Sequence, residues 1–270
     1  MPELPEVETT RRGLAEALVG RRLAGAVVRE RRLRYPVPEG LAETVRGARI
    51  EALERRAKYL ILRLDTGAWL LLHLGMSGHL RLVDAAAGAG RHDHVDLLLD
   101  GGRALRLTDP RRFGCLLAAT GDPERHPLLC RLGVEPLGPE WSGARLYRAT
   151  RGRRAAIKAV LMDAAVVVGV GNIYANEALH RAGIRPDRPA QRVGRARCTR
   201  LAAAVRAVLT DALAAGGTTL RDYADGTGEP GYFTPRLAVY GGGVCPACGR
   251  ELRTVRIAQR STWLCPRCQR

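Results

Sequence analysis

Cys245-Pro246-Ala247-Cys248 and Cys265-Pro266-Arg267-Cys268 are two Cys-x2-Cys pairs separated by sixteen residues. Pairs at this spacing are typical of tetrahedral zinc ligation by four thiolates. Gly249 follows the second cysteine and suits the tight turn of such a knuckle. The surrounding residues are too few for an independent core, so the metal would supply much of the folding energy. We therefore predict a terminal unit over residues 236–270 with one structural Zn²⁺, ligated by Cys245, Cys248, Cys265 and Cys268.

The residues between the two cysteine pairs, from Arg253 to Arg260, predict a β-hairpin that carries cations. An arginine fixed on a metal-pinned hairpin can hold a phosphate through two hydrogen bonds. A solvated charged face would have the same sequence, so both interpretations stay open at this point.

Upstream of this unit the chain is helical. Ala155 to Asp163 and Ile173 to Ala182 are two expected short helices, and Arg197 to Ala215 is a longer one. Asn172 is expected to cap the second short helix. The turn before it, Gly169-Val170-Gly171, offers amides that bind phosphate well, although the same glycines would also allow close helix packing. A Gly- and Pro-rich linker over residues 121–143 precedes these helices, and residues 217–231 are expected to form a mobile loop.

The first 120 residues are rich in short apolar runs separated by turn signals, which is typical of a sandwich or barrel. The expected strands are Val27-Val28, Tyr59 to Leu64, Trp69 to Leu74, Leu80 to Val83, Val95 to Leu99 and Leu105 to Leu107. An N-terminal helix over residues 5–19 precedes them, with Pro5 in its first turn and Gly20 as its stop.

The charge balance indicates a polyanionic partner, most simply nucleic acid. Lys+Arg is 44 against 27 Asp+Glu, which gives a net charge of +17 and a sequence pI near 10.7. Only Lys58 and Lys158 are lysines; the other 42 basic residues are arginines. Two such positions indicate a need for a compact point charge, or they are chance.

Targeting signals are absent from the sequence. It shows no segment of transmembrane length and no secretory signal, and the scattered and clustered cysteines fit a reducing cytosol. We therefore expect a cytoplasmic, nucleoid-associated monomer with no membrane partner.

The N-terminus Met1-Pro2-Glu3-Leu4-Pro5-Glu6 suggests covalent chemistry. Removal of Met1 would leave a secondary amine on Pro2, and an α-amino group is partly unprotonated near neutral pH. Such an amine can form a Schiff base, while Glu3 and Glu6 move protons. A proline-punctuated lead into a helix would have the same sequence.

Two loops that follow strands, His73 to Gly78 and Asp109 to Gly114, each place a bulky side chain beside glycine. Met76 and Phe113, if exposed, could wedge into a base stack; ordinary core filling is the alternative. His92-Asp93-His94 is expected to be a hydrogen-bonded loop rather than a metal site, because no third ligand follows at a suitable spacing.

Taken together, these stretches resemble the bacterial formamidopyrimidine-DNA glycosylase family. The matching segments are MPELPEVET, RRAKYL, HLGMSG, HDHVDL, TDPRRFG, VVVGVGNIYANEAL, GGTTLRDY, GEPGYF, VYG and AQRSTWLCPRCQR, in the family's order along the whole chain. The resemblance implies an α+β fold of three parts: an N-terminal β-sandwich with an N-terminal helix (residues 1–130), a helix–two-turn–helix domain (131–235) and the zinc finger (236–270). It also implies binding of double-stranded DNA with oxidised bases, excision of oxidised purines (8-oxoguanine and formamidopyrimidines), and strand cleavage by β,δ-elimination.

The resemblance further implies residue roles. The catalytic set is Pro2, Glu3, Glu6, Lys58 and Arg260. The DNA-contacting set is His73, Met76, His92, Arg111, Phe113, Lys158, Asn172, Tyr240, Arg256 and Arg260. The base-recognition loop contains Thr218, Thr219, Arg221 and Tyr223. Extrusion of the damaged nucleotide is required because its C1′ is shielded in the stack.

Two departures from the family pattern concern the base-recognition loop. Arg221 stands where many relatives carry lysine, and the short stretch Gly241 to Gly243 lacks the arginine that usually follows Tyr-Gly. Two alternatives also stay open: the endonuclease VIII branch, which prefers oxidised pyrimidines, and a non-catalytic zinc protein that binds damaged DNA. Leu4 and the Arg111-Arg112-Phe113 sequence favour the purine branch, and Pro2 with Glu3 and Lys58 favours an enzyme.

Overall fold

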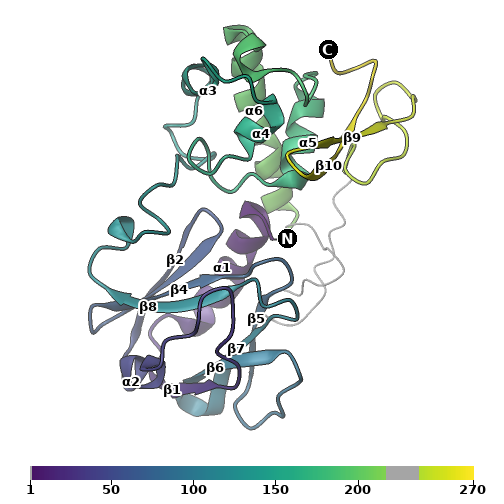
Figure 1. Cartoon of the computed structure of the whole chain (residues 1–270). Coiled ribbons are helices and arrows are strands. Elements are labelled where there is room, and N and C mark those ends of the chain that lie inside the picture. Colours follow the sequence, from purple (N-terminus) through teal and green to yellow (C-terminus); the bar gives the residue numbers. More distant parts are fainter. Residues whose placement is uncertain (1, 217–236) are drawn as a thin grey trace. The chain divides into compact units, whose positions relative to one another are not determined.

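The computed structural model describes residues 2–216 and 237–270 (Figure 1). Residues up to 130 form one compact unit, called unit 1 below. Residues 131–215 and 237–270 form a second, called unit 2. Among the described helices, none is both long and apolar enough to cross a membrane.

Unit 1 contains two antiparallel four-stranded sheets. One has the order β1-β6-β7-β5 and the other β2-β3-β4-β8. The strands are β1 (Leu23–Val28), β2 (Ile50–Arg56), β3 (Tyr59–Leu64), β4 (Ala68–His73), β5 (His79–Asp84), β6 (Asp93–Leu99), β7 (Arg103–Thr108) and β8 (Cys115–Thr120). Leu60 and Leu62 of one sheet share a single buried cluster with Leu97 and Leu105 of the other. The predicted β-sandwich is therefore confirmed.

The N-terminal helix α1 (Leu4–Leu18) covers part of this sandwich and contacts β2 and β3. Its buried face includes Val7, Leu14 and Leu18, as the helical spacing predicts. The helix ends at Leu18 with Val19 as its cap, and Gly20 follows with φ +87, a left-handed conformation that glycine adopts without strain. The predicted stop at Gly20 is confirmed.

Several elements of unit 1 were not predicted. They are the edge strands β2 and β8, the short helix α2 (Leu41–Val45) and the 3₁₀ turns Asp100–Gly102 and Pro123–Arg125. One expectation was partly wrong: Asp93 and His94 do not lie in a loop but begin strand β6.

Unit 2 is built from four helices and a hairpin. They are α3 (Gly143–Thr150), α4 (Ile157–Leu161), α5 (Asn172–Arg181), α6 (Arg195–Ala214), β9 (Arg253–Ile257) and β10 (Arg260–Leu264), with a 3₁₀ turn at Ala190–Arg192. The long helix α6 contacts both α3 and α5, and α5 contacts β10. The hairpin that carries the cysteine knuckles thus packs on the helices rather than standing alone.

Two details of unit 2 differ from expectation. Helix α3 was not predicted. The residue that caps α5 is Gly171, with Asn172 as the first helical residue, so the prediction that Asn172 is the cap was wrong. An extended backbone at Gly171 lets the Asn172 side chain leave the helix end and reach another element.

Candidate active site and nucleic-acid interface

The start of helix α1 buries two carboxylates beside Pro2. Glu3 and Glu6 are each 1% exposed. The Glu6 Oε2 atom accepts a hydrogen bond from the backbone N–H of Glu3 at 2.7 Å, and the Glu3 side chain accepts one from the backbone N–H of Glu6. This reciprocal capping box satisfies helix N–H groups that would otherwise lack partners. It also fixes Glu3 immediately after the residue whose amine is the candidate nucleophile.

An ion cluster ties this helix to the turn that carries Lys58. The Glu8 carboxylate accepts from Arg55 Nε at 3.0 Å, and Arg55 Nη1 donates to the carbonyl of Ala57 at 2.9 Å. Glu8 also pairs with Arg11 and Arg12 at 2.9 Å each. Burial raises the pKa of Glu8, but the hydrogen bonds and charges of these arginines outweigh it and hold the pKa at about 2. Glu8 is therefore ionised under ordinary conditions.

His73 ends strand β4 opposite Tyr59, whose ring centroid lies 4.8 Å away. Burial, with the nearby charges of Lys58 and Arg34, lowers the pKa of His73 to about 4. Its Nδ1 atom accepts the backbone N–H of Gly75 at 2.9 Å. The ring is thus neutral near pH 7 with its proton on Nε2, which makes it a hydrogen-bond donor suited to a phosphate oxygen.

The two loops predicted to carry wedge residues are packed backbone against backbone. A Cβ atom on Gly75 would lie 2.4 Å from Gly114 N, so only glycine fits there. The fully buried Asp109 carboxylate joins the loops, since it accepts from Ser77 Oγ at 2.9 Å and from Gly114 N at 2.8 Å. One buried carboxylate therefore sets the position of both loops.

The side chains carried by these loops differ in exposure. Phe113 is 47% exposed, one of the few exposed large hydrophobic residues in the described chain. The guanidinium carbon of Arg111 lies 5.1 Å from the Phe113 ring centroid, and Met76 is half-buried. Core filling does not account for Phe113, so its exposure agrees with the wedge interpretation.

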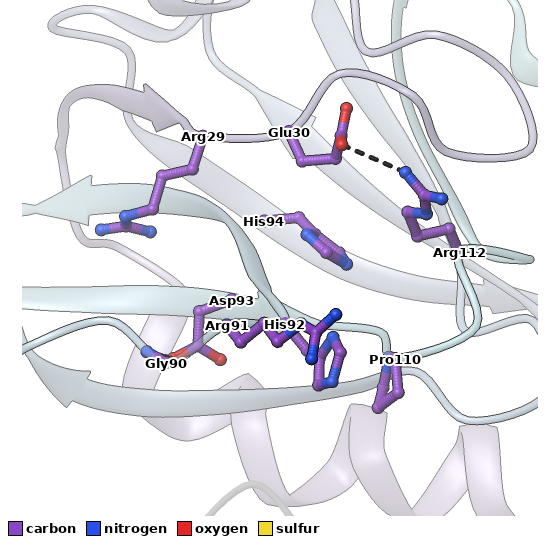
Figure 2. Close-up of a pocket in the computed structure, with 9 residues that line it drawn as sticks. All are labelled: Arg29, Glu30, Gly90, Arg91, His92, Asp93, His94, Pro110 and Arg112. Carbon is purple, nitrogen blue, oxygen red and sulfur yellow. Dashed lines mark hydrogen bonds and ion pairs between the residues drawn. The ribbon is translucent and has the colours of Figure 1, made fainter.

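His92 lies at a pocket of about 490 Å³ between the start of β6 and the end of β1 (Figure 2). Arg112 Nη1 pairs with Glu30 across one wall at 3.1 Å, and Arg29 pairs with Asp96 at 2.6 Å. His94, which also lines the pocket, is held through Nε2 by the carbonyl of Asp109 at 2.7 Å. Two of the three arginines that line the pocket are paired with carboxylates, and the third, Arg91, makes no ion pair with a described residue.

In unit 2, Asn172 and Lys158 both reach the hairpin. Asn172 Nδ2 donates to the carbonyl of Ser261 at 3.2 Å. Lys158 is fully buried, and its Nζ donates to Thr262 Oγ1 at 2.6 Å and to the same Ser261 carbonyl at 3.2 Å. The expectation that Lys158 contacts DNA is corrected: its ammonium lies in the interior and is used to hold strand β10.

Two buried residues of α5 complete the attachment of the C-terminal segment. Asn176 Oδ1 accepts the backbone N–H of Trp263 at 3.0 Å. Glu177 accepts three backbone N–H groups, from Ala238 at 2.7 Å, Val239 at 3.0 Å and Tyr240 at 2.8 Å. The Tyr240 ring then packs edge-on against Trp263 with centroids 4.7 Å apart. Tyr240 is therefore held on the same helix that begins with Asn172.

Arg256 and Arg260 are exposed on the hairpin. Strands β9 and β10 pair from Arg260 opposite Ile257 to Leu264 opposite Arg253, which confirms the predicted hairpin. Ala258 and Gln259 form its two-residue turn with φ +46 and +60, the left-handed geometry that matches the twist of a tight hairpin. Arg260 follows this turn directly as the first residue of β10, and its side chain is exposed.

The four predicted metal ligands converge. The sulfur atoms of Cys245, Cys248, Cys265 and Cys268 all lie within 4.8 Å of one another. Tetrahedral ligation at a Zn–S distance of about 2.3 Å places sulfurs roughly 3.8 Å apart, and the Cys245–Cys268 and Cys248–Cys265 separations are 3.8 Å and 3.5 Å. The donor set therefore fits one structural Zn²⁺. His180 Nε2 lies 3.4 Å from Cys245 Sγ, a position from which it can orient that ligand.

The expected base-recognition residues Thr218, Thr219, Arg221 and Tyr223 lie outside the described residues, as does the whole of the expected loop over residues 217–231.

Three regions of the sequence match family descriptions. Residues 1–116 match the formamidopyrimidine-DNA glycosylase N-terminal domain, residues 132–224 its H2TH domain, and residues 242–270 the zinc finger found in FPG and IleRS. The chain belongs to the formamidopyrimidine-DNA glycosylase family. Members from Halorhodospira halophila and Alkalilimnicola ehrlichii are 70% and 61% identical to it, each over the full length of both chains.

Solved structures of family members share the fold. The crystal structure of the MutM (Fpg) protein from Thermus thermophilus matches with a TM-score of 0.89 and 41% identity, over 99% of this chain and 98% of that one. Wild-type Lactococcus lactis Fpg, in complex with DNA containing N7-benzyl-Fapy-dG, matches with a TM-score of 0.91 and 30% identity over 99% of both chains. The same protein has been solved with DNA containing an abasic site.

Sequence reasoning missed four residues that organise the site. Glu8 and Arg55 join α1 to the Lys58 turn, Asp109 joins the two loops, and Glu177 anchors Tyr240. Each carries charge but is buried or nearly so. All four lie inside segments that match the family, so a charged residue within a matching segment was the signal that could have identified them.

Proposed function

We propose that this protein is a bifunctional DNA glycosylase and apurinic/apyrimidinic-site lyase that removes oxidised purines, including 8-oxoguanine and formamidopyrimidines, from duplex DNA. The observation that carries the proposal is the buried start of α1, where the capping box of Glu3 and Glu6 adjoins Pro2. The capping box stabilises the helix start, and the same two carboxylates are held where general acid–base chemistry beside the Pro2 amine would need them. The names and DNA complexes of the relatives support the substrate class.

In the proposed reaction, removal of Met1 frees the secondary amine of Pro2. The unprotonated nitrogen attacks C1′ of the damaged nucleoside, and the bond from C1′ to the base breaks. Glu3 supplies a proton for this step, and the sugar ring opens to give an iminium (Schiff base) between Pro2 and C1′. The positive nitrogen acidifies the C2′ proton. Its loss expels the 3′ phosphate by β-elimination, and a second elimination expels the 5′ phosphate.

Lys58 and Arg260 are the proposed helpers of elimination, because each can hold a departing phosphate. The Glu8–Arg55–Ala57 connection supports this role for Lys58, since it joins the Lys58 turn to the helix that carries the nucleophile. Glu6 keeps the backbone of Glu3 in place.

The remaining residues are proposed to hold the duplex. Neutral His73, together with Asn172, Tyr240, Arg256 and His92, would bind backbone phosphates. Phe113, Arg111 and Met76 would fill the space left by the extruded nucleotide. Thr218, Thr219, Arg221 and Tyr223 are the proposed base-recognition residues.

Each of the three expected segments has its own role in this proposal. Residues 1–130 supply Pro2, Glu3 and Lys58 for the chemistry together with some phosphate contacts, residues 131–235 supply Asn172 and the base-recognition residues, and residues 236–270 supply Arg260 and further phosphate contacts. We expect the protein to act as a monomer on chromosomal DNA in the cytoplasm.

Borohydride trapping tests the chemistry. Wild-type protein with a duplex containing 8-oxoguanine opposite cytosine should give a covalent adduct on reduction of the Schiff base, at the mass expected after loss of Met1. Glu3→Gln should lose base excision, while Glu54→Gln, at an exposed ion pair with Arg63, should keep it. Absence of any adduct would mean a non-catalytic binder, and faster cleavage of thymine glycol than of 8-oxoguanine would place the protein in the pyrimidine-specific branch.

A further inference from the structure

Unit 2 carries a group of arginines that the proposed site does not use. Residues 143–154 contain five arginines, residues 188–200 contain another five, and neither stretch contains an aspartate or a glutamate. The stretches correspond to α3 with the residues after it, and to the segment that leads into α6. Although the net charge is +17, many arginines elsewhere in the described chain form ion pairs with carboxylates. Two arginine-rich stretches without acidic residues therefore differ from the rest of the chain.

Packing of α3 on the first half of α6 brings the two stretches together. A Cβ atom on Gly143 would lie 2.4 Å from the Thr199 Cα, so the helices touch backbone to backbone. The ring of Tyr147, also on α3, makes cation–π contacts with two arginines. The guanidinium carbon of Arg151 lies 4.1 Å from the ring centroid and that of Arg195 lies 5.2 Å from it.

Hydrogen bonds fix one of these cations in place. Arg151 Nη2 donates to the carbonyl of Val193 at 2.8 Å, and Val193 follows the exposed Arg192 in the sequence. We call Tyr147 with Arg148, Arg151, Arg192 and Arg195 the arginine patch: Arg151 and Arg195 lie at the ring, and Arg148 and Arg192 are close to them in sequence. All four arginines are exposed.

The charge of the arginine patch is not neutralised by the part of the chain that the structure describes. Nearby arginines do have carboxylate partners: Arg153 pairs with Asp163 at 2.8 Å and Arg185 with Asp187 at 2.7 Å. Arg148, Arg192 and Arg195 make no ion pair with any described residue. The Arg151 and Arg195 guanidiniums at the Tyr147 ring carry like charges that repel each other, and the ring face offsets only part of that repulsion. An anion placed between the guanidiniums would remove it.

The patch lies away from the candidate phosphate contacts of unit 2. Helix α6 contacts α3 on one side and α5 on another, and α5 contacts β10 (Figure 1). Asn172 and Arg260 belong to α5 and β10, whereas the patch belongs to α3 and the start of α6. Figure 1 shows α3 and the hairpin on different sides of α6. One stretch of phosphates at Asn172 and Arg260 therefore does not account for the patch.

We propose that the arginine patch is a second contact surface for the sugar–phosphate backbone of duplex DNA, outside the stretch engaged at the excision site. The identity of the polyanion rests on the proposed function, but the excision chemistry plays no part in the argument. Guanidinium groups match phosphate oxygens with paired hydrogen bonds. Each phosphate neutralised releases counterions, so the contact makes affinity more salt-dependent without adding sequence preference.

The test compares the wild type with the double variant Arg192→Ser/Arg195→Ser. Each binds a reduced abasic-site analogue, which resists cleavage, in duplexes of about 14 and about 40 base pairs, just over one and almost four helical turns. Fluorescence anisotropy gives Kd over a range of salt concentrations. The slope of log Kd against log salt should fall by roughly 1 to 2 for the long duplex. It should be unchanged for the short one.

Two control variants separate the patch from net charge and from folding. Arg192→Lys/Arg195→Lys keeps both charges and should keep the wild-type slope. Arg46→Ser/Arg131→Ser removes two exposed arginines outside the patch and should leave the slope unchanged. An unchanged slope in the Arg192/Arg195 serine variant, an equal fall in the Arg46/Arg131 variant, or an equal fall on both duplex lengths would each overturn the proposal.

The proposed function is judged separately, by excision of 8-oxoguanine from the short duplex. We expect the wild type and the Arg192/Arg195 serine variant to excise it equally. Absence of excision in the wild type would contradict the proposed function and leave the salt slopes to decide the role of the patch.

Discussion

Replacing Glu8 by glutamine should weaken the connection between the nucleophile helix and the Lys58 turn. Glu8 is 9% exposed and accepts hydrogen bonds from Arg11, Arg12 and Arg55. Glutamine has nearly the same shape but no charge, and its amide nitrogen would face a guanidinium. The expected loss is therefore electrostatic rather than one of packing volume.

The magnitude follows from the pKa of Glu8, which is lowered from 4.5 to about 2. A shift of this size corresponds to at most about 3.4 kcal/mol. The Arg11 and Arg12 side chains are 27% and 60% exposed, so solvent screens part of the interaction. We expect a loss of about 1 to 2 kcal/mol in the free energy of unfolding at pH 7.

The pH dependence gives the sharper measurement. Because the folded-state pKa of Glu8 lies below its ordinary value, its stabilisation is present above pH 4.5 and is lost as the pH falls toward 2. Urea unfolding at pH 7 and at pH 3 should show the difference between wild type and Glu8→Gln shrinking at the lower pH. Glu54→Gln, at an exposed pair, should change stability by less than about 0.5 kcal/mol at either pH. A Glu8→Gln loss that is equal at both pH values would refute the electrostatic explanation.

Three other changes have expected outcomes. Asp109→Asn places an amide nitrogen against a donor such as Gly114 N–H. It should lower the free energy of unfolding by about 1 to 3 kcal/mol and lower the rate of excision. An unaltered melting temperature and excision rate would contradict the role given to Asp109. Since the folded-state pKa of His73 is about 4, below the ordinary 6.5, its contribution to stability is present above pH 6.5 and declines as the pH falls to 4. His73→Gln should flatten that slope in urea unfolding, and an unchanged slope would count against a neutral buried ring. Removing zinc with a chelator should abolish DNA binding until Zn²⁺ is restored, and retained binding by metal-free protein, checked by metal analysis, would argue against a structural ion.

The fold was predictable where local pattern and burial agree. Strand β3 has the expected bounds, Tyr59–Leu64, because it lies inside its sheet and its apolar run is almost unbroken. The two strands that were missed, β2 and β8, are the two edges of that same sheet. Strand β2 reads Ile-Glu-Ala-Leu-Glu-Arg-Arg, with charges that suit an exposed edge but hide the alternation. Strand β8 contains two alanines, which have weak strand preference.

The metal ligands of the site could be predicted from the sequence, whereas the residues that hold the site in place could not. Cysteine spacing alone identified the metal cluster, because thiolates at those intervals have few other uses. Lys158 shows the limit of such inference. Its rarity in an arginine-rich chain left open either a need for a compact charge or chance, and neither indicated where the charge lies: Nζ donates to the Ser261 carbonyl and to Thr262 Oγ1 in the interior. Only three-dimensional contacts distinguish a buried cation from an exposed one.

The hydrogen bonds from residues 238–240 to Glu177 fix the start of the C-terminal segment on α5. Because three backbone N–H groups bind one carboxylate, residue 238 is fixed relative to α5. An insertion or deletion between α6 and residue 238 would therefore change only the chain before residue 238. The C-terminal segment is therefore positioned from residue 238 onward by its contacts with α5, and the number of residues between α6 and residue 238 does not set the position of the hairpin.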